Sequence, residues 1–111
     1  MKTIQFFLLF TAYCLLSTFS SAQEISEADR VKMDIDRQKA KSVYNEGISN
    51  FKKRAYQDAL SSFDKAILLD PDFERAYYNR GAVKKRLKDY NGAIADFDRV
   101  IQLNPSAAKT F

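Results

Sequence analysis

The sequence contains an internal repeat with a period of 34 residues. Residues 40–71 and 74–105 are identical at ten positions when they are compared at this offset. The identical pairs are Tyr44/Tyr78, Asn45/Asn79, Gly47/Gly81, Tyr56/Tyr90, Ala59/Ala93, Phe63/Phe97, Asp64/Asp98, Ile67/Ile101, Leu69/Leu103 and Pro71/Pro105. A repeat of this length is one supersecondary unit that cannot bury its apolar face alone, so successive units stack into a solenoid. The sequence therefore predicts two stacked units, residues 40–73 and 74–107.

Each unit is expected to contain two helices and no strand. We expect the helices at 40–53 and 57–69 in the first unit, and at 74–87 and 91–103 in the second. In the second helix of each unit, apolar residues recur every three or four positions and form one stripe. The stripes are Ala59, Leu60, Phe63, Ala66 and Ile67, and then Ala93, Ile94, Phe97, Val100 and Ile101. Pro71 and Pro105 end the units because the residue before a proline is disfavoured in the helical region.

A glycine lies inside the first helix of each unit, although Gly costs about 1 kcal/mol against Ala in a helix. We expect Gly47 and Gly81 where the two helices of a hairpin cross closely. Ala59 and Ala93, which are also small, are expected on the other side of that contact.

The pattern resembles the tetratricopeptide repeat family. The residues that carry the resemblance are Tyr77, Gly47, Gly81, Ala59, Ala93, Phe63, Phe97, Ala66, Pro71 and Pro105, within the stretches YNRG, LDP and LNP. It implies an all-α fold of two tandem helix-turn-helix repeats in a right-handed array, which is a fragment of an α-solenoid. Four residues depart from the family pattern: Val43 replaces a large aromatic residue, Glu46 and Arg80 replace an apolar one, and Val100 replaces a small one. These departures predict looser packing in the same fold.

In this family the first helices line a concave groove that binds peptides, so the resemblance implies groove residues. Those of the first repeat would be Lys41, Tyr44, Asn45, Ile48, Phe51 and Lys52, and those of the second Arg75, Tyr78, Asn79, Ala82, Lys85 and Arg86. Asparagine can bond the backbone of an extended peptide, and Lys and Arg can pair with its carboxylates. The alternative is that the basic runs at 52–54 and 84–86 are a solvated face without a ligand.

The first 22 residues have the form of a secretory signal peptide. Lys2 precedes an apolar run at 4–16, and Ser20, Ser21 and Ala22 supply small residues before a cleavage site. The alternatives are an uncleaved membrane anchor, for which the run is shorter than the ~20 residues of a spanning helix, and a lipid anchor at Cys14. Cleavage predicts an exported protein, in the periplasm of a Gram-negative envelope or secreted, with no membrane span.

Removal of residues 1–22 would leave 89 of the 111 residues, with 17 Lys and Arg against 14 Asp and Glu, a net charge of +3. This mildly basic composition, together with export, argues against a nucleic-acid partner. Cys14 is the only cysteine and the chain has no histidine. We therefore predict no disulfide, no metal site, no cofactor and no active site.

The charged segment 23–39 is expected to be a helical extension or linker. Ser26 and Asp29 have the spacing of an N-terminal cap. Val31 and Ile35 share a stripe that does not face the same way as the apolar residues of the first repeat. Either the chain breaks near Lys39, or these two residues pack on something else. The segment is a solvated helix, or it contacts a partner.

Residues 108–111 continue the repeat register as the start of an unfinished capping helix. Phe111 falls at the position of Tyr77, the first buried position of a following helix. Two repeats are fewer than the three that solenoids usually need. We therefore expect an apolar side of the last helix pair to be covered by a second copy or by a partner.

The sequence as a whole favours a non-enzymatic adaptor or scaffold of the cell envelope. Its groove would bind an extended, acidic peptide or protein segment. Two alternatives remain open, which are a homo-oligomeric structural element and an accessory subunit of an envelope enzyme or transporter.

Overall fold

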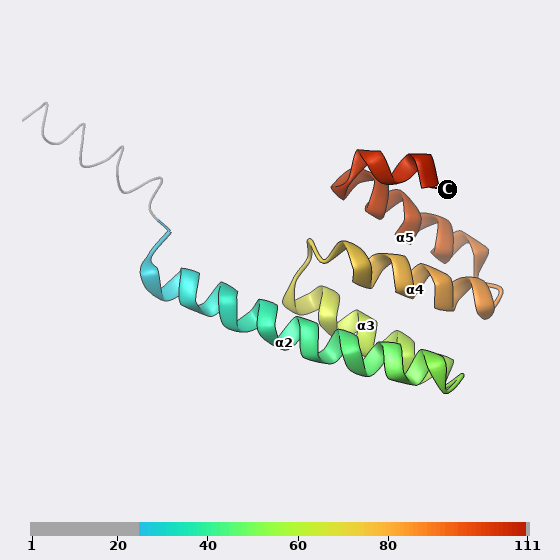
Figure 1. The fold of residues 1–111 in the computed structure, drawn as a ribbon, viewed down its shortest axis with the longest axis horizontal. Helices are drawn as coiled ribbons and strands as arrows, with labels where there is room; N and C mark the ends of the chain where they lie inside the picture. The colour runs from blue at the N-terminus through green and yellow to red at the C-terminus, as the bar shows by residue number, and fades with distance from the viewer. Residues whose placement is uncertain (1–24, 111) are drawn as a thin grey trace, which may run out of the picture. The chain divides into compact units, whose positions relative to one another are not determined.

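The computed structural model of the protein describes residues 25–110 (Figure 1). The predicted signal peptide and Phe111 lie outside the described residues. Contacts between residues divide the chain into two units, Met1–Lys32 and Met33–Phe111. Residues 25–110 contain four α-helices and one 3-10 helix and no strand, which confirms the all-α prediction.

The described part of the first unit is the beginning of α2, which spans Glu27–Lys52. The backbone N–H of Asp29 donates to Oγ of Ser26 at 3.2 Å, and that Oγ donates to Oδ2 of Asp29 at 2.7 Å. These bonds satisfy a backbone donor at the helix start, as the spacing predicts. α2 continues through Lys39 without a break.

The second unit contains the remainder of α2, then α3 (Tyr56–Leu69), α4 (Glu74–Arg86), α5 (Tyr90–Leu103) and the 3-10 helix η1 (Pro105–Thr110). Successive helices run in opposite directions and lie side by side (Figure 1). They form two helical hairpins, α2–α3 and α4–α5. Apart from the start of α2, each predicted helix end lies within one residue of the observed end.

The core passes from the first hairpin into the second. Ala59 and Phe63 of α3 and Val83 of α4 form a cluster and are fully buried. Val100 of α5 is also buried. Because Val83 belongs to the second hairpin, the two hairpins share apolar burial, and this is the stacking that the repeat predicts.

The glycines lie at close contacts between helices, as expected. A Cβ at Gly47 would lie 2.7 Å from Cε1 of Phe63, and a Cβ at Gly81 would lie 2.9 Å from Cε1 of Phe97. These distances are shorter than van der Waals contact. The nearest atoms belong to the phenylalanine rings rather than to the buried alanines that we expected there.

The two hairpin turns have the same backbone form. Arg54 before α3 and Lys88 before α5 both adopt positive φ, 61° and 64°. The next residue is the N-cap in each case, but only Asp89 caps its helix with a side chain, by accepting from the N–H of Gly92 at 3.0 Å. Ala55, at the matching position before α3, cannot do so.

Candidate functional site

A hollow of about 650 Å³ lies at the C-terminal end of α4. Its walls come from α2, α4, α5 and the turn between the last two helices. The lining residues are Phe51, Tyr78, Asn79, Ala82, Lys85, Arg86, Lys88, Tyr90 and Phe97. The rings of Tyr78 and Phe97 are in tilted contact, with centroids 5.8 Å apart. The site therefore combines aromatic walls with basic side chains, and we call it the first hollow.

A second hollow of about 370 Å³ lies between the middle of α2 and the start of α4. It is lined by Lys41, Tyr44, Asn45, Phe73 and Arg75. The ring of Tyr44 packs against the rings of Phe73, at 4.9 Å between centroids, and Phe63, at 5.7 Å. These contacts fix the Tyr44 ring as a wall of the second hollow.

Asn79 connects the two hollows. It lines the first, and its Nδ2 donates to Oη of Tyr44 at 2.9 Å and to the backbone carbonyl of Arg75 at 2.8 Å. Burial raises the pKa of Tyr44 above its ordinary value of 10.0, while the charge of Arg75 and the hydrogen bond from Asn79 oppose this. The phenol therefore stays neutral, and the amide nitrogen of Asn79 is used within the protein.

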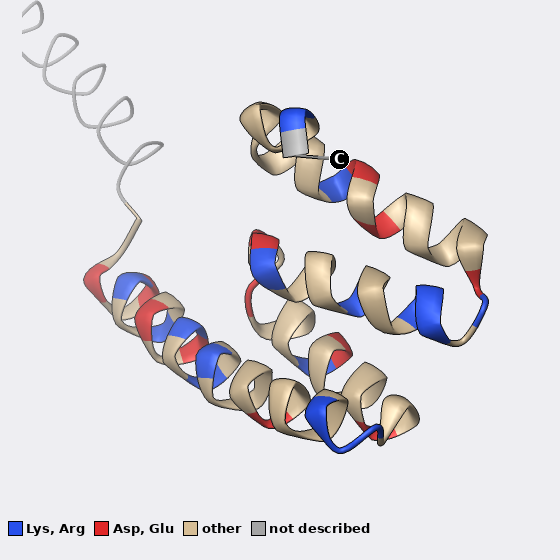
Figure 2. Cartoon of the chain, turned by 45° about the vertical axis from the view of Figure 1, so that its right-hand side comes forward, with Lys and Arg blue, Asp and Glu red and all other residues tan. Residues whose placement is uncertain are grey.

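The residues that line the two hollows include five cations and no carboxylate. Three of the cations, Lys85, Arg86 and Lys88, lie in the first hollow, and Lys41 and Arg75 lie in the second. Figure 2 shows basic residues gathered at the C-terminal end of α4 and in the turn that follows it. Hollows with one sign of charge attract ligands of the opposite sign, so an anionic ligand fits both.

Eight of the ten predicted site residues line one of the two hollows, and two do not. Lys41, Tyr44, Asn45 and Arg75 line the second hollow, and Tyr78, Asn79, Lys85 and Arg86 line the first. Ile48 instead packs against the core cluster, and Lys52 is exposed at the end of α2.

Four lining residues were not among the predicted groove residues. They are Phe73, Lys88, Tyr90 and Phe97. Tyr90 and Phe97 repeat Tyr56 and Phe63 of the first unit, which pack in the core, so the repeat gives no signal for these two residues at a hollow. The groove residues that the resemblance implies lie on the first helix of each repeat, whereas the hollows extend to the turns and to α5.

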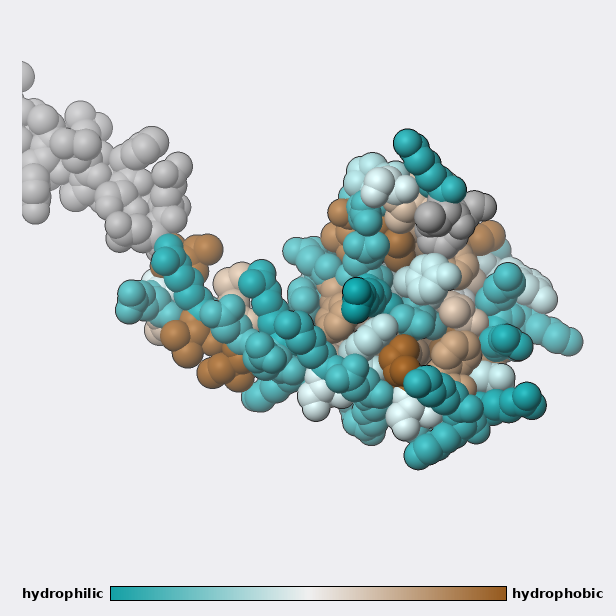
Figure 3. All heavy atoms as spheres, in the orientation of Figure 1, coloured by the Kyte–Doolittle hydropathy of each residue, from teal (hydrophilic) through white to brown (hydrophobic). Residues whose placement is uncertain are grey.

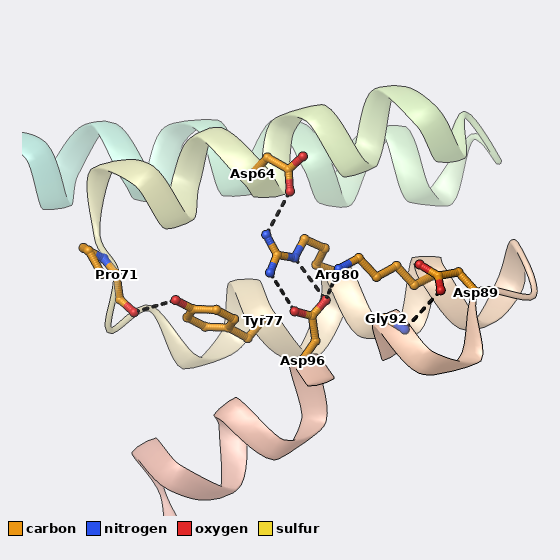
Figure 4. Close-up of polar contacts among 8 residues, drawn as sticks. Asp64, Pro71, Tyr77, Arg80, Asp89, Gly92 and Asp96 are labelled. Carbon is orange, nitrogen blue, oxygen red and sulfur yellow. Dashed lines mark hydrogen bonds and ion pairs between the residues drawn. The ribbon is translucent and has the colours of Figure 1, made fainter. Parts of the chain in front are cut away.

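A separate polar cluster joins α4 to α3 and α5 (Figure 4). Nε of Arg80 donates to Oδ2 of Asp96 at 3.0 Å and its Nη2 to Oδ1 at 2.6 Å, while Nζ of Lys84 lies 3.0 Å from Oδ2. The carboxylate of Asp96 is 4% exposed. Nη1 of Arg80 reaches back to the first hairpin and donates to Oδ1 of Asp64 at 2.9 Å.

This cluster corrects the expectation of loose packing at Arg80. The Arg80 side chain is 19% exposed, and its guanidinium joins α3, α4 and α5 through two carboxylates. The hydrogen bond to Asp96 is the largest cause that raises the pKa of Arg80 above its ordinary value, burial opposes it, and Asp64 adds to the rise. The same arginine lies 5.5 Å above the ring of Tyr77, whose Oη donates to the carbonyl of Pro71 at 2.8 Å.

The described residues show neither a metal cluster nor a helix suited to the membrane. Within residues 25–110, His, Cys, Asp and Glu side chains form no group of three or more that could hold a metal ion. In the same range, no helix combines the length and the apolar character of a membrane span.

Comparison with known proteins agrees with this geometry. The family model of the tetratricopeptide repeat matches the α4–α5 hairpin and the segment after it. Residues 74–107 are thus similar to a tetratricopeptide repeat. The crystal structure of MamA matches with a TM-score of 0.59 and 29% identity, over 60% of this chain and 39% of the MamA chain. A search of curated proteins finds no match.

The chain therefore has the fold of a fragment of a tetratricopeptide-type solenoid. Both likenesses support a protein–protein interaction scaffold in general terms. The residues that line the two hollows indicate the chemical class of the ligand.

Proposed function

We propose that the protein is a non-enzymatic scaffold that binds an extended, acidic peptide segment along α2 and α4. The observation that carries this proposal is the charge of the two hollows, which hold five cations and no carboxylate. Lys and Arg form charge-assisted hydrogen bonds with carboxylates, and the aromatic walls offer apolar contact between them. Asn79 and Tyr44 hold the two hollows in a fixed relation, so one extended segment can engage both.

A peptide library tests this proposal. Fluorescein-labelled peptides with and without carboxylates are titrated against wild type, a Lys85→Glu/Arg86→Glu variant and a control that carries Lys39→Glu/Lys65→Glu. Both pairs are exposed, and both change the charge equally, but the control pair lies outside the hollows. We expect acidic peptides to bind wild type and the control, more weakly at high salt, and to lose binding to the first variant. Equal binding by both variants would remove the proposal.

We further propose that the protein acts in the cell envelope. This rests on the sequence of residues 1–22 alone, with its positive start, apolar run and small residues before position 23. The test is fractionation of the producing cells followed by the intact mass of the protein. Export with cleavage gives a chain that begins at Gln23, whereas an uncut chain in the cytoplasmic fraction contradicts it.

Homo-oligomerisation is a second candidate function, favoured by the apolar surface of α2. Val31 is 58% exposed and Ile35 is 49% exposed. Apolar side chains interrupt the hydrophilic surface over the N-terminal half of α2 (Figure 3). Sedimentation of wild type and of a Val31→Ser/Ile35→Ser variant tests this. A larger species that the variant lacks supports an oligomer, and identical profiles refute it.

A further inference from the structure

The outer face of α5 exposes apolar side chains next to a carboxylate. Tyr90 is 58% exposed and Ile94, one turn later, is 57% exposed. Asp98, a further turn along, is also exposed, and no basic side chain within residues 25–110 forms an ion pair with it. The three residues lie four positions apart, so they share one face of the helix. We call this the α5 face.

The first hairpin contains the same face in a covered form. Tyr56, Leu60 and Asp64 of α3 precede Tyr90, Ile94 and Asp98 by 34 residues. Tyr56 and Leu60 are partly buried and pack against the core cluster, to which α4 contributes Val83. Arg80, three residues before Val83, donates to Asp64 at 2.9 Å. The packing of α4 on α3 therefore indicates which kind of helix could cover the α5 face.

We propose that the α5 face docks a helix of a partner protein, and that this helix carries a basic residue followed three positions later by an apolar residue. The basic residue would pair with Asp98 as Arg80 pairs with Asp64. The apolar residue would cover Ile94 and Tyr90 as Val83 covers the cluster of α3. The proposal concerns a surface distinct from the proposed peptide site, although Tyr90 also borders the first hollow.

A second copy of the chain does not satisfy this requirement through head-to-tail stacking. In such a stack, α2 of the next copy would take the place that α4 takes on α3. At the positions of Arg80 and Val83, α2 has Glu46 and Ser49. Glu46 would meet Asp98 with the same charge, which is unfavourable, and Ser49 would leave the apolar side chains without a partner.

The surface around Glu46 is polar as well. A hollow of about 290 Å³ is lined there by Glu46, Asn50, Asp58, Ser61, Ser62 and Lys65. None of these side chains is apolar. The surface of α2 around Glu46 and the α5 face therefore differ, one polar and one apolar, which disfavours head-to-tail association through these two surfaces.

Substitution of Glu46 and Ser49 tests, by gain of function, whether a basic residue followed three positions later by an apolar residue is enough for docking. Glu46→Arg with Ser49→Val gives α2 the pair that α4 uses. In sedimentation of the full chain, we expect association that rises with concentration and exceeds that of wild type. Adding Asp98→Arg should reverse this gain, whereas adding Asp34→Arg, an exposed control on α2 outside the hollow around Glu46, should not.

A peptide probe tests docking in trans on the wild-type chain. The probe is a labelled peptide of residues 74–87, the α4 sequence, measured by fluorescence anisotropy. We expect Asp98→Arg in the chain to weaken its binding by about fivefold, and Arg80→Glu in the peptide to restore binding to that variant. Far-ultraviolet circular dichroism of each variant separates loss of binding from loss of fold.

Three results would overturn the proposal. The first is no probe binding at about 1 mM, and the second is equal binding to wild type and to Asp98→Arg. The third is self-association of wild type that Ile94→Lys abolishes, which would make a second copy the occupant. Failure of the acidic-peptide titration with probe binding intact would refute the proposed groove and leave this docking face standing.

Discussion

At the scale of single residues, Asp96 is a buried carboxylate that pairs with two cations, Arg80 and Lys84. Asp96→Ala would leave both cations partly buried without their closest partner, so we expect the free energy of unfolding to fall by about 3 kcal/mol. Urea denaturation measures this.

The matched control is Asp98→Ala, two residues away on the same helix. Asp98 is exposed, and a surface substitution of this kind changes the free energy of unfolding by less than about 0.5 kcal/mol. A similar small effect for both variants would mean that the buried cluster is not a source of stability.

Because of Tyr44, the free energy of unfolding is expected to depend on pH in the alkaline range. Its pKa is raised in the folded protein, chiefly by burial, so folding favours the protonated phenol. The corresponding stabilisation is complete below the ordinary value of 10.0 and is lost as the pH rises through the folded pKa. We expect Tyr44→Phe, which cannot ionise, to show a shallower decline in the free energy of unfolding above pH 10.0.

Below that pH the same variant should be less stable by about 1 kcal/mol, because Asn79 loses the acceptor of its hydrogen bond. Urea denaturation at a series of pH values measures both effects. Parallel pH profiles for wild type and variant would contradict the assignment of the alkaline decline to Tyr44.

The residues that sequence reasoning missed are those whose roles depend on neighbours in space. Arg80 departs from the family pattern, and the departure alone predicts weaker packing. Arg80 is instead well packed, because Asp96 on α5 and Asp64 on α3 accept hydrogen bonds from opposite sides of its guanidinium. Neither carboxylate is near Arg80 in the sequence, and the first repeat has Glu46 and Ser62 at the corresponding positions, so the repeat could not reveal the cluster.

At the scale of helices, the close contact between α2 and α3 at Gly47 leaves no room for a side chain at this position. Ala has a better helix propensity by about 1 kcal/mol, but its Cβ would lie 2.7 Å from the fully buried ring of Phe63. We expect Gly47→Ala to lower the free energy of unfolding by about 1–3 kcal/mol, as overpacking does. In a double-mutant cycle with Phe63→Leu, the penalty should shrink, because the smaller side chain vacates the space. An additive cycle would contradict this explanation.

The start of α3 lacks a cap that the start of α5 has. Ala55 and Asp89 have similar backbone angles, with φ of −83° and −84°, but only Asp89 accepts a hydrogen bond from its helix. We expect Asp89→Ala to cost about 1 kcal/mol and Ala55→Ser to add about 0.5–1 kcal/mol. Thermal unfolding measures both. A loss of stability in Ala55→Ser would show that the hydroxyl does not reach the backbone of α3.

The helices could be predicted from the sequence because repeat period, apolar spacing and prolines all indicate the same ends. The candidate site was predicted less completely. Register placed Tyr44, Asn79 and Arg86 at the hollows, but it also placed Ile48 there, which packs on the core instead. A repeat pattern predicts on which face of a helix a residue lies. Which side chains on that face remain accessible depends on the rings that pack beside them.

At the scale of the whole stack, the two hairpins are expected to unfold together. Val83 is fully buried in a cluster with Ala59 and Phe63 of the first hairpin, and Arg80 pairs with Asp64 across the same boundary. In a linear array, cooperative unfolding depends on such contacts between neighbouring units. Wild type should therefore show one transition in which circular dichroism and tyrosine fluorescence coincide.

Val83→Ala tests this coupling, with Val100→Ala as its control. Both valines are buried, so each substitution should cost about 2 kcal/mol through lost contact and a cavity. Val100 lies on α5, which packs against α4 and η1, whereas Val83 belongs to the cluster shared with the first hairpin. Native-state hydrogen exchange should therefore show different opening free energies for the two hairpins in Val83→Ala and equal ones in Val100→Ala. The same separation in both variants would mean that general loss of stability, and not the boundary between the hairpins, decides whether they unfold as one.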